Sequence, residues 1–103
     1  AKRLAFTGDI VGAEEAAALG FVNEVVSADE LDDRVAEVTA AIAVGPPLAL
    51  SMTKRMLDNA ATASFAAAVE TESLAQNVNF TTSDTLEAGK AFLERRTPRF
   101  EGR

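Results

Sequence analysis

The chain has 103 residues, 48 % of them hydrophobic and 25 % charged, a composition typical of one folded domain rather than a disordered segment. It contains no Cys, His, Tyr or Trp, which excludes disulfides, thiol nucleophiles and the usual imidazole base or metal ligand. The net charge of −6 argues against a nucleic-acid partner, and no apolar run approaches the roughly 20 residues of a membrane span. We therefore expect a cytoplasmic protein without a membrane segment.

The first quarter of the chain predicts short helices separated by glycine turns. Residues 1–6 are typical of the end of a helix whose beginning is absent, so we expect a fragment of a longer protein. Residues 7–9, Thr-Gly-Asp, predict a turn. Residues 13–19 predict a helix closed by Gly20, and the β-branched residues 21–26 predict a short strand or a buried connector.

The middle of the chain predicts two longer helices. Ser27 and Glu30 have the spacing of a capping box, and an apolar stripe follows it at Leu31, Val35, Val38 and Ile42. The Gly-Pro-Pro sequence at 45–47 predicts the end of that helix and the start of the next. Residues 48–61 carry only a narrow polar stripe, so we expect this helix to be enclosed on several sides, with Lys54 in a structural salt bridge.

A further helix is predicted to run to about residue 79, capped by Thr62 or Ser64. Glu72 projects from its broad apolar surface, which predicts a buried carboxylate held by hydrogen bonds or arginines. Four phenylalanines spread along the chain are expected to anchor the core or a subunit interface: Phe6, Phe21, Phe65 and Phe92.

The last helix is predicted to begin at Ser83 and Asp84, which can cap a first turn, and to stop before Pro98. Residues 90–103 hold five basic residues against two acidic ones, whereas residues 1–44 hold nine acidic against three basic. This local excess of arginine suits one compact anion, such as a phosphate group.

Together these patterns predict a mainly α segment of five or six helices over residues 1–103. Apolar faces on more than one side of a helix predict contacts beyond this chain, supplied by a second subunit or by an absent domain.

Three blocks in this order resemble the C-terminal part of the enoyl-CoA hydratase/isomerase, or crotonase, superfamily: FTGDIVGAEEAAALGFVNEVV, GPPLALSMTKRML and SDTLEAGKAFLERRTPRF. The resemblance spans essentially the whole chain. Departures are mild, with Phe21 where leucine is usual, Ala88 where glycine is usual and Arg95 where lysine is preferred.

The resemblance implies the helical trimerisation region of the crotonase fold, without its N-terminal β/α spiral core. It implies an acyl-CoA-processing parent, an enoyl-CoA hydratase adding water across the 2,3 double bond of enoyl-CoA thioesters in fatty acid metabolism. The partners implied are the acyl-CoA thioester, the missing core and further copies, as a trimer or a dimer of trimers. No cofactor is required, because the coenzyme A thioester is the substrate.

The catalytic carboxylates and the oxyanion hole of this family belong to the core, so no catalytic residue and no metal ligand is expected in these 103 residues. By resemblance, Arg95 is the best candidate to contact the adenine-phosphate end of CoA. Arg96, on the packed face, is the weaker one and is also a candidate structural ion pair. Phe80 is the candidate aromatic near the adenine.

Two alternatives stay open. The chain could be a free-standing helical oligomerisation module without a catalytic duty. The parent could also perform another reaction of the superfamily, such as enoyl-CoA isomerisation, dehalogenation, decarboxylation or thioester hydrolysis, because the residues that separate these reactions lie upstream. The acyl-chain preference is likewise not encoded here.

Overall fold

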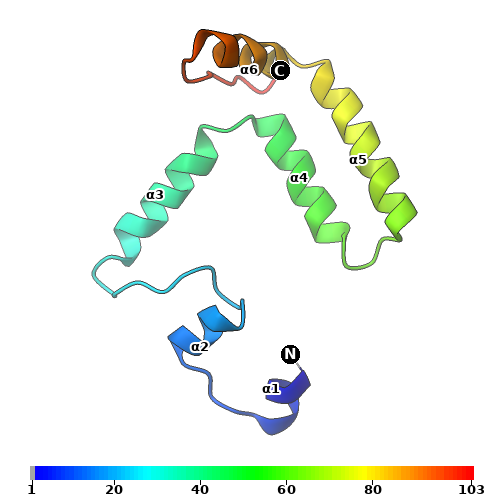
Figure 1. Cartoon of the computed structure of the whole chain (residues 1–103). Helices are drawn as coiled ribbons and strands as arrows, with labels where there is room; N and C mark the ends of the chain where they lie inside the picture. The colour runs from blue at the N-terminus through cyan, green and yellow to red at the C-terminus, as the bar shows by residue number, and fades with distance from the viewer. Residues whose placement is uncertain (1) are drawn as a thin grey trace. The chain divides into compact units, whose positions relative to one another are not determined.

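In the computed structural model, which describes residues 2–103, every regular element of those residues is a helix (Figure 1). This confirms the predicted helical class and its five or six helices. In chain order the helices are α1 (Lys2–Thr7), α2 (Ala13–Ala18), α3 (Leu31–Ala43), α4 (Pro47–Asn59), α5 (Phe65–Phe80) and α6 (Ser83–Glu94). The chain divides into two compact units, Ala1–Glu37 and Val38–Arg103, with the boundary inside α3.

In the first unit, glycines end the two short helices. Gly8 follows α1 at φ 68°, and Gly20 follows α2 at φ 75°, a region that only glycine enters without steric cost. The Gly20 amide donates to the carbonyl of Ala17 at 3.0 Å, and the Phe21 amide donates to that of Ala16 at 2.9 Å. These two bonds form a Schellman motif, so Gly20 closes α2 as predicted.

The connector at residues 21–26 is neither a strand nor buried, which corrects the prediction. Phe21 is 58 % exposed, because no element of the first unit covers it. An ion pair joins the connector to α3: the Nε of Arg34 donates to Glu24 of the connector at 2.5 Å. The Nη1 of Arg34 also binds Glu37 on α3. Half of the predicted capping box also forms, since the carboxylate of Glu30 accepts from the amide and hydroxyl of Ser27.

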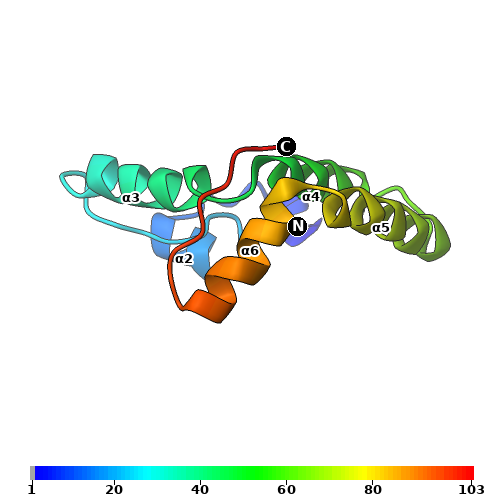
Figure 2. The ribbon, with the colours of Figure 1, turned by 90° about the horizontal axis from the view of Figure 1, so that it is seen from above.

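In the second unit, α4 and α5 lie side by side and α6 packs against α5 (Figures 1 and 2). Among the described residues only two hydrophobic side chains are buried, Ala75 on α5 and Ala91 on α6. The second unit therefore has almost no buried core, and most of its large apolar side chains are exposed.

Three predictions about α4 and α5 are wrong for this reason. Helix α4 begins at Pro47 as expected, but it is not enclosed, and Leu57 is 70 % exposed. Lys54 has no ion pair within residues 2–103. Glu72 lies exposed on α5 rather than buried.

The cap of α5 is Ser64, one of the two predicted candidates, whose hydroxyl accepts from the Ala67 amide at 3.2 Å.

Across residues 2–103 no single helix is both long and apolar enough to cross a bilayer, and only the bent pair α3–α4 has the necessary length and composition.

Candidate functional site

The candidate site is built on α6 and the tail that follows it. Helix α6 begins because Thr82 caps it: the Thr82 hydroxyl accepts from the Thr85 amide at 3.2 Å and donates to the Asn79 carbonyl at 2.7 Å. Ser83 and Asp84, the predicted caps, instead bind the backbone of residues 101–103. Thr82 was missed because three adjacent hydroxyl or carboxyl residues are equally suited to the position by sequence.

Helix α6 ends at Glu94, earlier than the proline stop predicted at Pro98. Arg95 adopts the left-handed conformation, with φ 53° and ψ 41°. Its amide donates to the Phe92 carbonyl at 3.3 Å, and the Arg96 amide donates to the Ala91 carbonyl at 3.0 Å. This is the Schellman motif again, with arginine in the position that Gly20 fills after α2.

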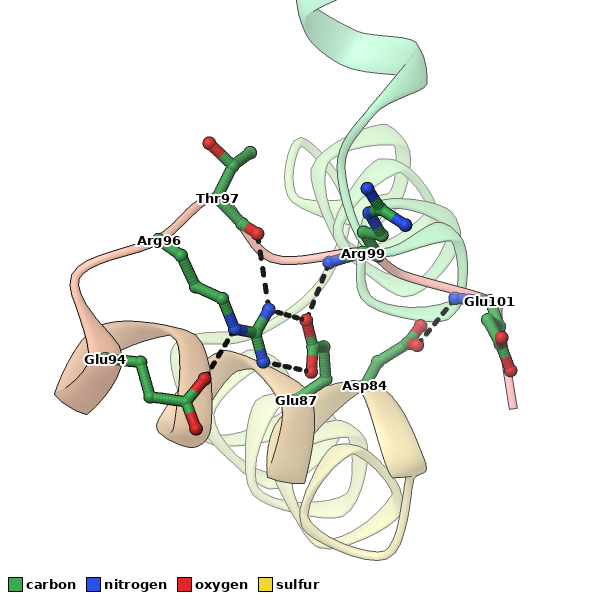
Figure 3. A network of polar contacts seen from close by, with 7 residues as sticks. All are labelled: Asp84, Glu87, Glu94, Arg96, Thr97, Arg99 and Glu101. Carbon is green, nitrogen blue, oxygen red and sulfur yellow. Dashed lines mark hydrogen bonds and ion pairs between the residues drawn. The ribbon is translucent and has the colours of Figure 1, made fainter.

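The tail returns along α6, and the carboxylates of the helix hold its backbone (Figures 1 and 3). Asp84, only 5 % exposed, accepts the amide of Glu101 at 2.8 Å and that of Gly102 at 2.9 Å. Ser83 donates its own amide to the Arg103 carbonyl at 2.7 Å. Asp84 therefore anchors the tail and does not cap the helix.

Arg96 lies at the centre of the polar network in Figure 3. Its Nη1 and Nη2 donate to the two carboxylate oxygens of Glu87 at 2.5 and 2.9 Å, which is a bidentate pair. Its Nε donates to Glu94 at 2.6 Å, and Nη1 also reaches the Thr97 carbonyl at 3.3 Å. The Arg99 amide completes the network by donating to Glu87 at 2.9 Å.

This network shifts both ionisations toward the charged forms. The hydrogen bonds from the Arg96 guanidinium, followed by that from the Arg99 amide, lower the pKa of Glu87 from 4.5 to about 2. The hydrogen bonds to Glu87 and then Glu94 raise the pKa of Arg96 further above its ordinary range. Arg96 thus forms a structural ion pair, which was one of the two roles predicted for it beside a contact to CoA.

Arg95 has the opposite environment. Its side chain is exposed, and it makes no hydrogen bond or ion pair within the described part of the chain. Phe92, one turn earlier on α6, is 83 % exposed. An unpaired, exposed guanidinium can bind a phosphate, and an exposed aromatic ring can stack against a flat base. Phe92 was predicted to anchor a core or a subunit interface, and its exposure shows that it is not in a core of the described chain.

Phe80 lies elsewhere. It ends α5 and lines a pocket of 280 Å³ with Pro46, Asn79, Phe100 and neighbouring residues of α6. Because α6 has 12 residues, its length of about 18 Å separates Phe80 from Arg95. The structure brings Arg95 and Arg96 to one helix end and leaves Phe80 at the other, so the three predicted residues do not form one cluster.

Comparison with known proteins explains this architecture. The family model for enoyl-CoA hydratase/isomerase matches residues 1–103. The chain is 36 % identical to a probable mitochondrial enoyl-CoA hydratase 2 of Arabidopsis thaliana, and 33 % identical to the crotonyl-CoA hydratase of Syntrophomonas wolfei. These matches cover 98 % and 97 % of this chain but only 34 % and 38 % of the relatives.

Solved structures agree with the sequence matches. The crystal structure of an enoyl-CoA hydratase from Bacillus anthracis superposes with a TM-score of 0.92 at 31 % identity, covering 99 % of this chain and 40 % of that one. A Geobacillus kaustophilus structure gives a TM-score of 0.90 at 35 % identity, covering 100 % and 41 %. The chain spans about two fifths of these relatives. It belongs to the enoyl-CoA hydratase/isomerase family, and its all-helical architecture is that of a C-terminal region of the crotonase fold.

Proposed function

We propose that residues 1–103 are the C-terminal helical region of an acyl-CoA-processing enzyme, an enoyl-CoA hydratase that adds water across the 2,3 double bond of enoyl-CoA thioesters. The catalytic carboxylates and the oxyanion hole are supplied by a preceding core, and no cofactor is required beyond the CoA thioester substrate. Similarity to relatives named as hydratases supports this reaction. This region contributes three things: a CoA-edge contact, a subunit interface and a cover for the acyl pocket.

The CoA contact rests on one observation, the unpaired guanidinium of Arg95 at the end of α6. A phosphate at the adenine end of CoA offers the charge and oxygens that an arginine fork binds well. Phe92, exposed and one turn away, suits the adenine better than Phe80, which lies at the far end of the helix. Arg96 is the poorer ligand, because Glu87 and Glu94 already occupy its donors.

The interface role rests on the uncovered apolar side chains. Phe6 and Phe65 are each more than 80 % exposed, and other uncovered apolar side chains run along every helix of the second unit. Exposed apolar area on this scale marks surfaces that another protein covers. The cover we propose is the catalytic core together with neighbouring copies, assembled as a trimer or a dimer of trimers.

A hydratase is not the only reaction compatible with this region. The methylmalonyl-CoA decarboxylase of Escherichia coli is also 33 % identical to the chain, which equals the value for the S. wolfei hydratase. Isomerisation or decarboxylation is thus the nearest alternative within the family. The compartment is proposed to be the cytoplasm, although the names of some relatives place those proteins in mitochondria.

A free-standing oligomerisation module is the second candidate, and the same exposed apolar faces favour it. The two candidates differ in what the gene encodes ahead of Ala1. A crotonase-type core in the same reading frame supports the enzyme, whereas an independent start of translation at this segment supports the module.

The functional test uses the complete protein as its gene encodes it. We expect hydration of crotonyl-CoA, with the KM of Arg95→Ala raised about tenfold and kcat little changed, because a charge-assisted contact to bound CoA is lost. Arg34→Ala is the matched control, since Arg34 is an ion-paired arginine in the first unit and should leave the KM unchanged. An unchanged KM in Arg95→Ala contradicts the CoA contact, and the absence of a core contradicts the whole proposal.

A further inference from the structure

Arg95 is the only non-glycine residue with a positive φ in the described chain. The left-handed region disfavours any residue with a Cβ, because that atom approaches the following carbonyl. Such a conformation persists only where the surroundings over-determine it, and such positions cluster at functional sites. Gly20 shows that this chain uses glycine at the equivalent position of the same motif after α2.

Besides the two backbone bonds of the motif, the contacts of Arg96 surround this position. Its guanidinium binds residues on both sides of Arg95: the carboxylate of Glu94 before it and the carbonyl of Thr97 after it (Figure 3). The bidentate pair with Glu87 then ties this short loop to the middle of α6. A chain that left α6 in another direction would break these bonds.

The direction of the Arg95 side chain follows from this. In a helix continuing toward Pro98, the side chain would lie back over the preceding turn of α6. With Arg95 in the left-handed conformation the chain reverses. The guanidinium of Arg96 turns to the acidic side of α6, while that of Arg95 remains unpaired and exposed.

We propose that Arg96 is a positioning residue: its bidentate pair with Glu87 holds Arg95 in the left-handed conformation, and this aims the Arg95 guanidinium at a phosphate of CoA. The proposal rests on the proposed CoA contact. It assigns different duties to two adjacent arginines, since Arg95 touches the ligand and Arg96 acts only through Arg95. Lysine cannot replace Arg96, because an ammonium group has no planar fork for Glu87.

The experiment measures binding of CoA and of 3′-dephospho-CoA to the complete protein by calorimetry. The ratio of the two dissociation constants reports the contact to the 3′-phosphate. We expect a ratio of about ten or more for the unmodified protein, which falls to about one in Arg95→Gly. Arg95→Gly suits this purpose because glycine keeps the turn and removes only the side chain.

Arg96→Lys and Glu87→Gln should each lower the ratio several-fold, and crystal structures of both should show Arg95 with a negative φ. In the Arg95→Gly background Arg96→Lys should change the ratio no further, because its effect passes through Arg95. Arg34→Lys is the matched control, since Arg34 also binds two carboxylates and lies in the first unit. It should leave the ratio unchanged.

The two proposals fail in different ways. An unchanged ratio in Arg95→Gly overturns the CoA contact, and the φ of Arg95 in Arg96→Lys then still decides whether Arg96 holds the turn. A reduced ratio in Arg95→Gly with an unchanged ratio in Arg96→Lys overturns the positioning role alone. If Arg95→Gly keeps part of the ratio and Arg96→Lys lowers that part further, Arg96 contacts the ligand itself.

Discussion

At the scale of single residues, Arg95 and Gly20 occupy the same position in two Schellman motifs. Glycine enters the left-handed region without steric cost, whereas the Cβ of arginine lies too close to the following carbonyl oxygen there, which destabilises the folded chain. The motif after α6 therefore forms although its central residue disfavours the left-handed conformation.

Arg95→Gly should accordingly raise the free energy of unfolding by about 1 kcal/mol, as the left-handed strain is relieved. Urea unfolding followed by circular dichroism measures the change. Arg95→Ala is the comparison, because alanine retains the Cβ and should bring no such gain. A destabilised Arg95→Gly would mean that the arginine side chain contributes more to the fold than the strain costs.

The protonation of Glu87 should determine how firmly the tail is held at acidic pH. Its pKa is about 2 in the folded chain and 4.5 ordinarily, so its contribution to stability is complete above about pH 4.5 and is lost as the pH falls toward 2. The amide of Arg99, which donates to Glu87, should lose its protection from hydrogen exchange over this interval. In Glu87→Gln the loss should already be present at neutral pH, and an Arg99 amide that is equally protected at pH 2 and pH 6 would refute the role of this carboxylate.

At the scale of elements, threonine hydroxyls close the junction between α5 and α6, and that of Thr82 is the one that also accepts an amide of α6. Thr82 is 7 % exposed and bonds both to the carbonyl of Asn79 and to the amide of Thr85, so it closes one helix and opens the next. The cap of α5, Ser64, is exposed and serves one helix only.

Thr82→Ala should therefore cost about 1–2 kcal/mol of unfolding free energy, and Ser64→Ala about 0.5–1 kcal/mol. Ser51→Ala on α4 is the control, since this exposed serine caps no helix and should change stability by less than about 0.5 kcal/mol. Thermal or urea unfolding of the three variants gives the order. A Thr82→Ala effect no larger than that of Ser51→Ala would show that the junction holds without the cap.

Element type and order could be predicted from the sequence because glycine, proline and apolar spacing act locally. Helix boundaries at Gly20 and Pro47 needed nothing else. The roles of Asp84 and Glu87 could not be predicted in this way, because their partners are backbone amides 12 to 18 residues later in the chain. The early end of α6 was missed for the same reason: the contacts that hold Arg95 come from Glu87 and Glu94 through Arg96.

At the scale of the whole molecule, burial was predicted least well. The apolar stripes of α4 and α5 were recognised, yet Lys54 and Glu72 are not enclosed, because no element of the described chain covers these helix faces. The chain covers only 34–40 % of the first relatives it matches, which leaves most of the proposed cover outside it.

The isolated chain should therefore self-associate and bind a hydrophobic dye such as anilinonaphthalene sulfonate, whereas the complete protein should bind little of it. Light scattering and dye fluorescence at micromolar concentration measure both properties. A monodisperse monomer without dye fluorescence would contradict the proposed covered faces and favour a chain that is stable by itself.

The way in which α6 holds the tail also determines which sequences the tail can have. Helix carboxylates bind the backbone amides of Arg99, Glu101 and Gly102, not their side chains, whereas the amide of Phe100 has no acceptor among the described residues. A proline scan should consequently separate these positions: proline is native at 98 and breaks no backbone bond at 100, but at 99, 101 or 102 it removes an amide that binds α6. Release of the tail is measured as lost hydrogen-exchange protection of its remaining amides. The bonds that hold residues 99, 101 and 102 thus depend on main-chain amides that proline lacks, a constraint different from the side-chain packing of a core.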